Sequence, residues 1–175
     1  MSTLSNQNFG LIIAYLLPGF VSLWGVSYFS PTVASWIAAS QQGSPSVAGF
    51  MYVTLASLAA GVTASAVRWS ILDHLHHATG IVPPVWKFAH LEGKLQGYQT
   101  LIENHYRYYQ FYANMFIAAA FAFCARLVSE GPPVTNRIAT TCGFLTLEVI
   151  FFAGSRDTLQ KYYSRTQQLL NFHHP

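Results

Sequence analysis

The stretch that decides the fold is residues 1–67, MSTLSNQNFGLIIAYLLPGFVSLWGVSYFSPTVASWIAASQQGSPSVAGFMYVTLASLAAGVTASAV, which contains no Lys, Arg, Asp or Glu. Every charged side chain of the protein lies at Arg68 or later. A water-soluble domain rarely has so long an uncharged surface. A lipid-embedded domain does, because a charge at mid-bilayer costs several kcal/mol. The distribution of charge therefore predicts an integral membrane protein.

The composition points to the same class. The 175 residues are 52% hydrophobic and only 9% charged, whereas soluble domains carry about 25% charged residues. The length fits one integral membrane domain, 1–175. Because the Lys and Arg residues are scattered, nucleic-acid binding is not indicated. A soluble helical bundle with a very apolar core is the alternative, and it is disfavoured because such bundles rarely contain four separate 20-residue apolar windows.

Four windows reach the roughly 20 apolar residues that a spanning helix needs: about 9–29, 47–67, 109–128 and 134–154. We therefore predict an all-α protein, a four-transmembrane-helix bundle in which helices three and four extend into the cytoplasm. Lys and Arg are usually enriched on the cytoplasmic side. Both termini and the central loop are thus predicted to be cytoplasmic, in a bacterial inner membrane. That face holds Arg68, Lys87, Lys94, Arg107, Arg156, Lys161 and Arg165, and the opposite face holds Arg126 and Arg137.

The cytoplasmic parts are the loop 68–108 and the tail 155–175. Residues 68–78 are expected to continue the second span until Gly80 caps the helix. An apolar heptad stripe then predicts one helix from about Leu91 to Val128. The fourth helix is expected to continue two to four turns past Gly154, so that the two extensions pack as a cytoplasmic stalk. The stripe is Leu91, Leu95, Tyr98, Ile102, His105, Tyr109, Tyr112 and Phe116.

A polar stripe lies largely opposite the apolar one on the third helix: Glu103, Arg107, Gln110 and Asn114. Polar groups within a membrane face protein or water rather than lipid. Two alternatives stay open: the stripe packs on a helix of the same protomer, or it lines a pore or a subunit contact in a homo-oligomer.

Glu148 lies inside the fourth window, and an intramembrane carboxyl group is a functional-site hypothesis by default. It would bind a cation, relay a proton or form a ring at a pore constriction. The alternative is a protonated or hydrogen-bonded structural acid. In the second window, Ser57, Gly61 and Ser65 share one helix line, and this small-residue spacing predicts a close helix contact.

Asp73, His74, His76 and His77 cluster on one predicted helix and are candidates for ligand sensing or for metal binding. Membrane di-iron enzymes use several His boxes, whereas this chain has one cluster. We therefore predict no metal and no cofactor. No Gly-x-Ser-x-Gly, Walker or Rossmann motif occurs, so an enzyme is not predicted.

Three strings carry a resemblance: Arg68-Trp69 with Asp73, His76-His77 and Thr79-Gly80; HYRYYQFYAN at residues 105–114; and SRDTLQKYY at residues 155–163. They resemble a group of small bacterial four-span membrane proteins without an assigned function, and this resemblance implies no catalytic residues. The general layout is also similar to that of pore-forming anti-phage membrane effectors.

The leading hypothesis is an oligomeric, ion-permeable or gated membrane assembly, for which a bacterial defence effector is one role, and its partners are the lipid bilayer and further copies of the chain. The first alternative is a membrane scaffold or adaptor that binds a cytoplasmic protein or a small-molecule ligand. The second alternative is a metal-dependent membrane enzyme.

Overall fold

A computed structural model describes residues 10, 12–39, 47–130 and 137–171. Within this part every regular element is helical, and the predicted all-α class is confirmed. The elements are η1 (Ile12–Leu16), α2 (Leu17–Ser27), α3 (Pro31–Ala39), α4 (Val47–Ala78), η2 (Phe88–Leu91), α5 (Leu95–Leu101), η3 (Ile102–Tyr106), α6 (Arg107–Glu130) and α7 (Arg137–Asn171).

Three helical segments in the described part are long and apolar enough to cross a membrane: Val47–Ala78, Leu95–Ser129 and Ile138–Asn171. The windows 47–67 and 109–128 and most of 134–154 fall on these segments; residues 134–136 lie outside the described part of the chain. The first window holds a shorter apolar helix, Ile12–Ser27. Helix α4 has 32 residues, about 48 Å at 1.5 Å per residue, so it exceeds the roughly 30 Å of a bilayer core. The expected continuation of the second span past residue 67 is therefore confirmed.

Helix α4 ends where the sequence predicts, and the cap is a Schellman motif. Gly80 has φ +98° and donates its N–H to the carbonyl of His77, while Ile81 donates to the carbonyl of His76. These two bonds satisfy carbonyls that a helix end leaves free, and the left-handed turn suits glycine. Ile81 then turns inward and is buried in one cluster with Leu72, which lies about two turns before the cap. The cap thus fixes the direction in which the chain leaves α4.

The third long helix begins later than predicted. Leu91 belongs to the short 3₁₀ helix η2, and Gly93 has φ +77°, a left-handed turn that ends any α-helical continuation. The helix starts at Leu95 and runs to Ser129, with a π-helical segment, η3, just before α6. The predicted start at Leu91 is wrong because this turn, and not the heptad pattern, sets the boundary.

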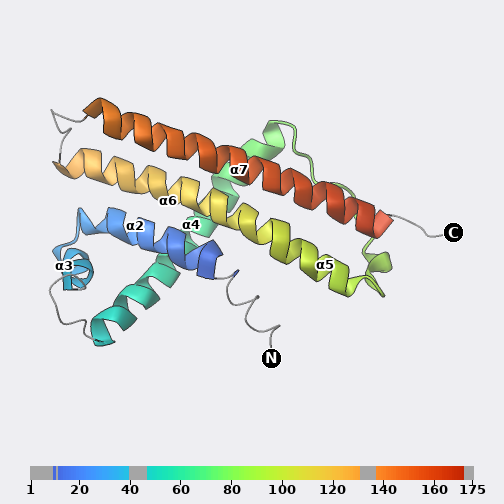
Figure 1. Cartoon of the computed structure of the whole chain (residues 1–175), viewed down its shortest axis with the longest axis horizontal. Helices are drawn as coiled ribbons and strands as arrows, with labels where there is room; N and C mark the ends of the chain where they lie inside the picture. Colours follow the sequence, from blue (N-terminus) through green and yellow to red (C-terminus); the bar gives the residue numbers. More distant parts are fainter. Residues whose placement is uncertain (1–9, 11, 40–46, 131–136, 172–175) are drawn as a thin grey trace.

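Helix α7 lies antiparallel along this third segment, and the extensions of the two helices beyond the predicted spans pack against each other (Figure 1). It runs unbroken from Arg137 to Asn171, somewhat further past Gly154 than predicted. We call the contact line between the segment Leu95–Ser129 and α7 the α6–α7 seam. Its membrane half pairs Phe116 with Phe152, and its stalk half pairs Tyr106 with Tyr162. From Tyr98 to Phe116 the heptad stripe therefore faces α7, whereas Leu95 is 54% exposed.

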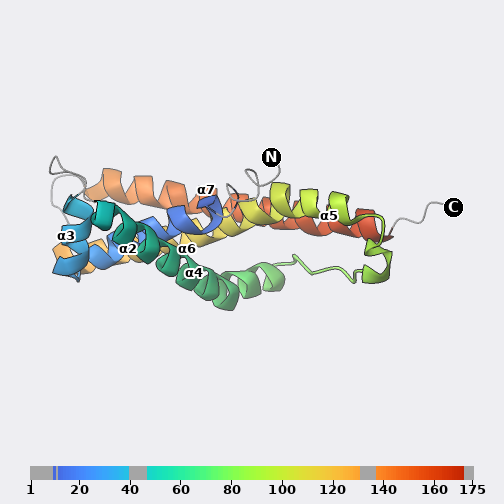
Figure 2. The same ribbon diagram turned by 90° about the horizontal axis from the view of Figure 1, so that it is seen from below.

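The apolar N-terminal helix packs on α4 and α6, while α4 crosses the α6–α7 pair obliquely (Figures 1 and 2). Contact with α4 is backbone to backbone. A Cβ on Gly19 would lie 1.7 Å from the carbonyl oxygen of Ser57, and one on Gly61 would lie 2.0 Å from that of Tyr15. Both values are far below any van der Waals contact, so only glycine fits. The close contact predicted from Ser57 and Gly61 is confirmed.

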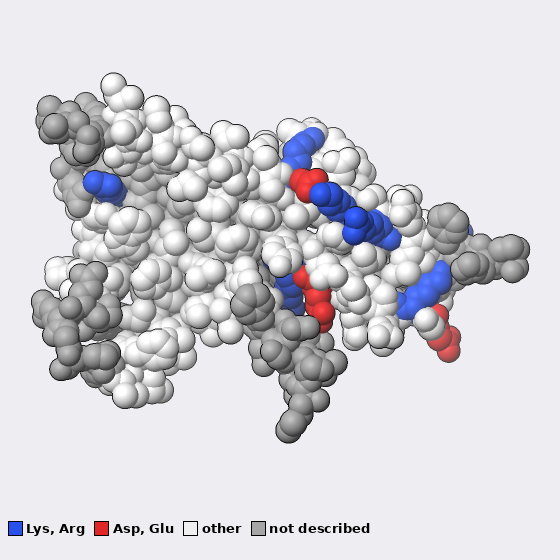
Figure 3. Space-filling view, viewed as in Figure 1, with Lys and Arg blue, Asp and Glu red and all other residues white. Residues whose placement is uncertain are grey.

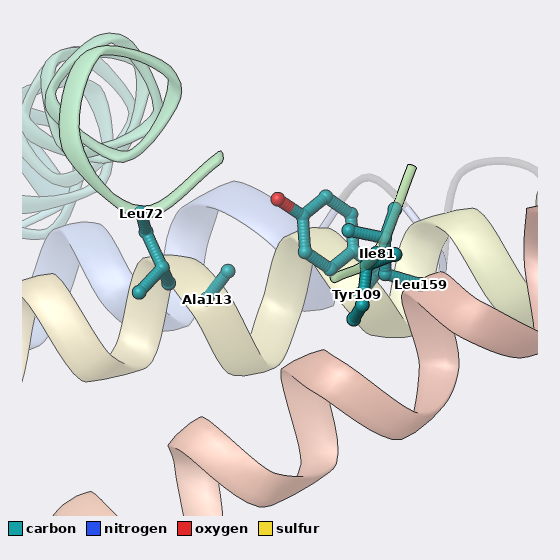
Figure 4. Close-up of a cluster of buried hydrophobic side chains, with 5 residues drawn as sticks. All are labelled: Leu72, Ile81, Tyr109, Ala113 and Leu159. Carbon is teal, nitrogen blue, oxygen red and sulfur yellow. The ribbon is translucent and has the colours of Figure 1, made fainter. Parts of the chain in front are cut away.

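The buried core lies where the end of α4 meets α6 and α7. Figure 4 shows its five side chains, contributed by α4, by the residue after its cap, by α6 and by α7: Leu72, Ile81, Tyr109, Ala113 and Leu159. Charged side chains avoid one end of the molecule. In Figure 3 they gather around α5 and the second half of α7, and the opposite half is almost uncharged. The molecule is thus divided into a lipid-compatible half and a polar half.

Candidate functional site

The strongest concentration of polar side chains is a junction where α4 leaves the predicted bilayer. Tyr109 donates its hydroxyl proton to Asp73 Oδ1. Arg68 Nε lies 3.9 Å from the same oxygen, and the Arg68 guanidinium carbon lies 5.1 Å from the centre of the Tyr109 ring. Arg68 and Tyr109 are both buried. A buried charge is tolerated only when it is paired, so these three residues form one unit.

A second pair completes the junction. His76 Nε2 lies 2.9 Å from Ser155 Oγ, and both residues are fully buried. Ser155 donates its hydroxyl proton to the carbonyl of Phe152. A hydroxyl has one proton to give, so His76 must donate from Nε2, and its Nδ1 is left without a partner among the described residues. A nucleophilic serine needs the reverse arrangement, in which the serine donates to the histidine.

The members of the predicted His cluster diverge in the structure. His74 bonds the carbonyl of Trp69, His76 bonds Ser155 and His77 Nε2 lies 3.2 Å from the hydroxyl of Tyr163. Asp73 accepts the hydroxyl proton of Tyr109 and lies beside Arg68. Among the described residues, no group of three or more His, Cys, Asp and Glu side chains is placed to hold a metal ion.

Within this chain the polar stripe of the third helix is covered by the N-terminal helix. Asn114 Nδ2 donates to the carbonyl of Ala14 at 2.8 Å, and Gln110 Nε2 donates to the hydroxyl of Tyr15 at 3.0 Å. Arg107 donates to Gln110 Oε1 at 3.1 Å. Gln110 and Asn114 are buried, whereas Glu103 and Arg107 are half-buried. The packing alternative thus accounts for the contacts of Gln110 and Asn114.

Glu148 differs from the stripe. It is 9% exposed, and neither carboxyl oxygen has a hydrogen-bond partner in the described part of the chain. The ring pairs Phe116–Phe152 and Phe123–Phe144 lie on either side of it along the seam. Their register places it opposite residues 119 and 120, both alanines. No Lys or Arg of the described residues forms an ion pair with it: Arg156 bonds Thr79, and Arg107 bonds Gln110.

Outside the predicted bilayer, one open pocket of about 250 Å³ lies between the segment after α4 and one face of α7. Arg156 lies in its wall and is held by Thr79: Nη1 donates to Oγ1 at 2.6 Å and Nη2 to the carbonyl at 2.7 Å. Sequence reasoning missed this pocket because Thr79 and Arg156 lie 77 positions apart.

The junction itself also went unpredicted, although its signal is present in the sequence. The buried line of α4 is Ser57, Gly61, Ala64, Arg68, Leu72 and His76, in steps of three and four. Extending the small-residue line past the span would have reached Arg68 and His76. The three strings that carry the resemblance supply the residues of the junction, because Asp73, Tyr109 and Ser155 each come from a different string.

Comparison with known proteins adds no relative. The chain matches no protein-family model, no curated protein and no solved structure. The resemblances drawn from the three strings and from the general layout therefore stay hypotheses, and function has to be argued from the geometry.

Proposed function

We propose that this chain is a four-span inner-membrane protein that anchors a cytoplasmic stalk, and that the stalk binds a protein partner. For the fourth crossing we take Ile12–Ser27. Its 16 residues reach about 24 Å at 1.5 Å per residue. Its backbone is packed on α4, and Leu17, Phe20 and Trp24 are about half exposed, as suits a lipid-facing side. The excess of Lys and Arg supports cytoplasmic termini.

A stretch of exposed apolar side chains outside the spans carries the binding proposal. We call residues 81–94 the connector. In it, Val82, Val85 and Phe88 are 71%, 87% and 53% exposed. The connector lies beside the far end of α7, since Asn171 Nδ2 bonds the carbonyl of Val85 and Lys94 Nζ bonds that of Leu169. Asn171 lies 17 residues past Gly154, about 25 Å at 1.5 Å per residue, so lipid does not cover Val85 and Phe88 beside it. Exposed apolar patches of this kind mark protein contacts.

The test is a comparison of two variants of the full-length protein, purified from membranes with its associated proteins. Val85→Asp combined with Phe88→Asp should reduce the recovery of a specific partner about tenfold, since apolar anchors dominate interfaces. Gln168→Asp adds a charge to an exposed polar position of the stalk and should leave recovery unchanged. A partner that the double variant retains in full, or the absence of any protein enriched over an unrelated membrane protein, would refute the proposal.

A second candidate is the ion-permeable assembly, and Glu148 is the observation that favours it. An uncompensated carboxyl group within a span is costly, and a pore or a subunit contact would supply water or partners. The test is ion flux in liposomes from a protein of known oligomeric state, with Glu148→Gln. Asn114→Leu would be uninformative, because Asn114 bonds Ala14 within the protomer. Equal flux from wild type and Glu148→Gln, or no flux from a verified oligomer, counts against a pore.

A further inference from the structure

We propose that the pocket beside Arg156 binds a phosphate-bearing anion at the cytoplasmic surface of the membrane. The pocket has about 250 Å³ and is walled by residues 80–82 and 84 on one side. On the other side α7 contributes Arg156, Gln160, Tyr163, Ser164 and Gln167. The pocket shares Ile81, Val82 and Pro84 with the connector but does not include Val85 or Phe88, so the inference does not depend on the proposed protein partner.

The chemistry of the lining favours an anion. Among the described residues, Arg156 is the one charged side chain in the pocket wall, and no carboxylate accompanies it. The amides of Gln160 and Gln167 add neutral N–H donors, whereas Ser164 already donates its hydroxyl proton to the carbonyl of Lys161. The Asp157–Lys161 ion pair, at 2.6 Å, lies on the same helix but outside the lining. The pocket therefore combines one net positive charge with several N–H groups.

Arg156 is oriented in advance for such a ligand. Thr79 takes two of its N–H groups, and a guanidinium has five. Three donors remain on a planar fork that is held in place, and this geometry matches phosphate oxygens. A side chain that is already fixed loses little rotamer entropy on binding.

Size and depth narrow the ligand class. The volume is below the roughly 300–1,000 Å³ of sites for drug-sized molecules, so a headgroup or a small phosphate ester fits. Arg156 lies two residues beyond the predicted end of the fourth span, about 3 Å at 1.5 Å per residue. The phosphate layer of an anionic cytoplasmic leaflet lies at this level. The two sources of a phosphate monoanion are thus a phospholipid headgroup and a soluble ester.

The test measures saturable binding to the detergent-purified full chain with four probes: inorganic phosphate, glycerol 3-phosphate, short-chain phosphatidylglycerol and short-chain phosphatidylcholine. Saturation by phosphatidylglycerol alone identifies a lipid headgroup site. Equal binding of phosphatidylglycerol and glycerol 3-phosphate identifies a site for the ester itself. Binding of phosphatidylcholine as tight as that of phosphatidylglycerol, or no saturable binding by any probe, overturns the proposal.

Two matched pairs of variants locate the binding. Gln160→Glu places a carboxylate in the pocket and should weaken binding at least about tenfold, the range of one charge-assisted bond. Gln168→Glu, on the same helix but outside the lining, should not. Arg156→Gln should abolish binding, whereas Lys161→Gln, which removes the same charge outside the pocket, should preserve it. Equal losses within either pair would show general surface electrostatics and overturn the site.

Discussion

The membrane half and the stalk half of the α6–α7 seam use the same two helices in one register but different ring chemistry. In the membrane half Phe123 stacks on Phe144 with ring centres 4.0 Å apart. In the stalk half the Tyr98 and Tyr162 hydroxyls meet at 3.3 Å. Phenylalanine gives way to tyrosine near Gly154, where a Cβ would lie 3.0 Å from the Tyr112 ring. The change from phenylalanine to tyrosine thus marks the level at which the two helices are predicted to leave lipid. Glu148 is a polar side chain on the membrane side of this level.

The largest expected effect tests which faces of α7 are buried in protein. Leu159 is 2% exposed in the core of the stalk half, so Leu159→Ala should lower the free energy of unfolding by about 2–5 kcal/mol. Leu147 is 49% exposed on the membrane half, where lipid or detergent covers it. Leu147→Ala should therefore change stability by less than about 0.5 kcal/mol. Thermal unfolding in detergent measures both, and similar losses would contradict the lipid-facing assignment.

The next largest effect is a gain in the free energy of unfolding, expected at Glu148. Replacing an unpartnered buried carboxyl group by an apolar side chain of similar length, Glu148→Met, should stabilise the protein by about 1–3 kcal/mol. Glu103→Met, outside the predicted span, is the control and should gain nothing comparable. A stabilised Glu148→Met protein that has lost its ion flux would show that the cost of Glu148 is retained for function. A destabilised one would mean that the carboxyl group has a structural partner.

At the boundary between the two halves, Tyr109→Phe removes the hydroxyl that donates to Asp73. We expect a loss of about 1–3 kcal/mol, because Asp73 keeps its charge but loses its hydrogen bond to α6, while the ring beneath Arg68 remains. Tyr108→Phe is the matched control, since Tyr108 is 44% exposed. Unfolding midpoints that match for the two variants would show that the junction does not depend on this hydroxyl.

The smallest effect concerns the pH dependence of the stalk half. Arg165 Nη1 donates to His105 Nε2 at 2.7 Å, a bond that requires a neutral imidazole. Partial burial, then Arg165 and Lys161, lower the pKa of His105, against Asp157, which raises it. Between this lowered pKa and the unfolded value of about 6.5 the unfolded chain binds more protons. Stability should therefore fall as pH drops below about 6.5.

His105→Gln should flatten this decline without abolishing it, because His76 is also buried in the folded chain. The measurement is the unfolding temperature of both proteins between about pH 5 and pH 8, the range over which histidine titrates. An identical slope in the variant would exclude His105 as a contributor.

Sequence periodicity predicted the elements whose cause is local or repetitive. The cap at Gly80, the contact at Gly61 and the seam from Tyr98 to Phe116 each follow from spacing or from a single glycine. It failed at Leu91, where a left-handed turn at Gly93 overrides the heptad pattern. It also could not decide what covers Asn114, because the partner is a carbonyl 100 positions away and any neighbouring helix would serve equally well.

The candidate site was predicted less completely than the fold. Asp73 and His76 were recognised as chemically interesting, but their partners Tyr109 and Ser155 come from other helices, and pairing between helices is a tertiary property. Steps of 100° per residue also turn His74 away from His76. A cluster in sequence thus became four separate contacts in space, and the Arg156 pocket arose from residues that no motif connects.

Helix α7 is continuous and its neighbour is not, and this difference has a mechanical consequence. Helix α7 is an unbroken α-helix over 35 residues, so a twist applied at Gln167 reaches Glu148, about 29 Å away at 1.5 Å per residue, without a joint. Its neighbour contains the π-helical segment Ile102–Tyr106 just outside the bilayer. Helix α7 is therefore continuous, whereas its neighbour is interrupted at this segment. A displacement of the stalk would be transmitted into the membrane along α7.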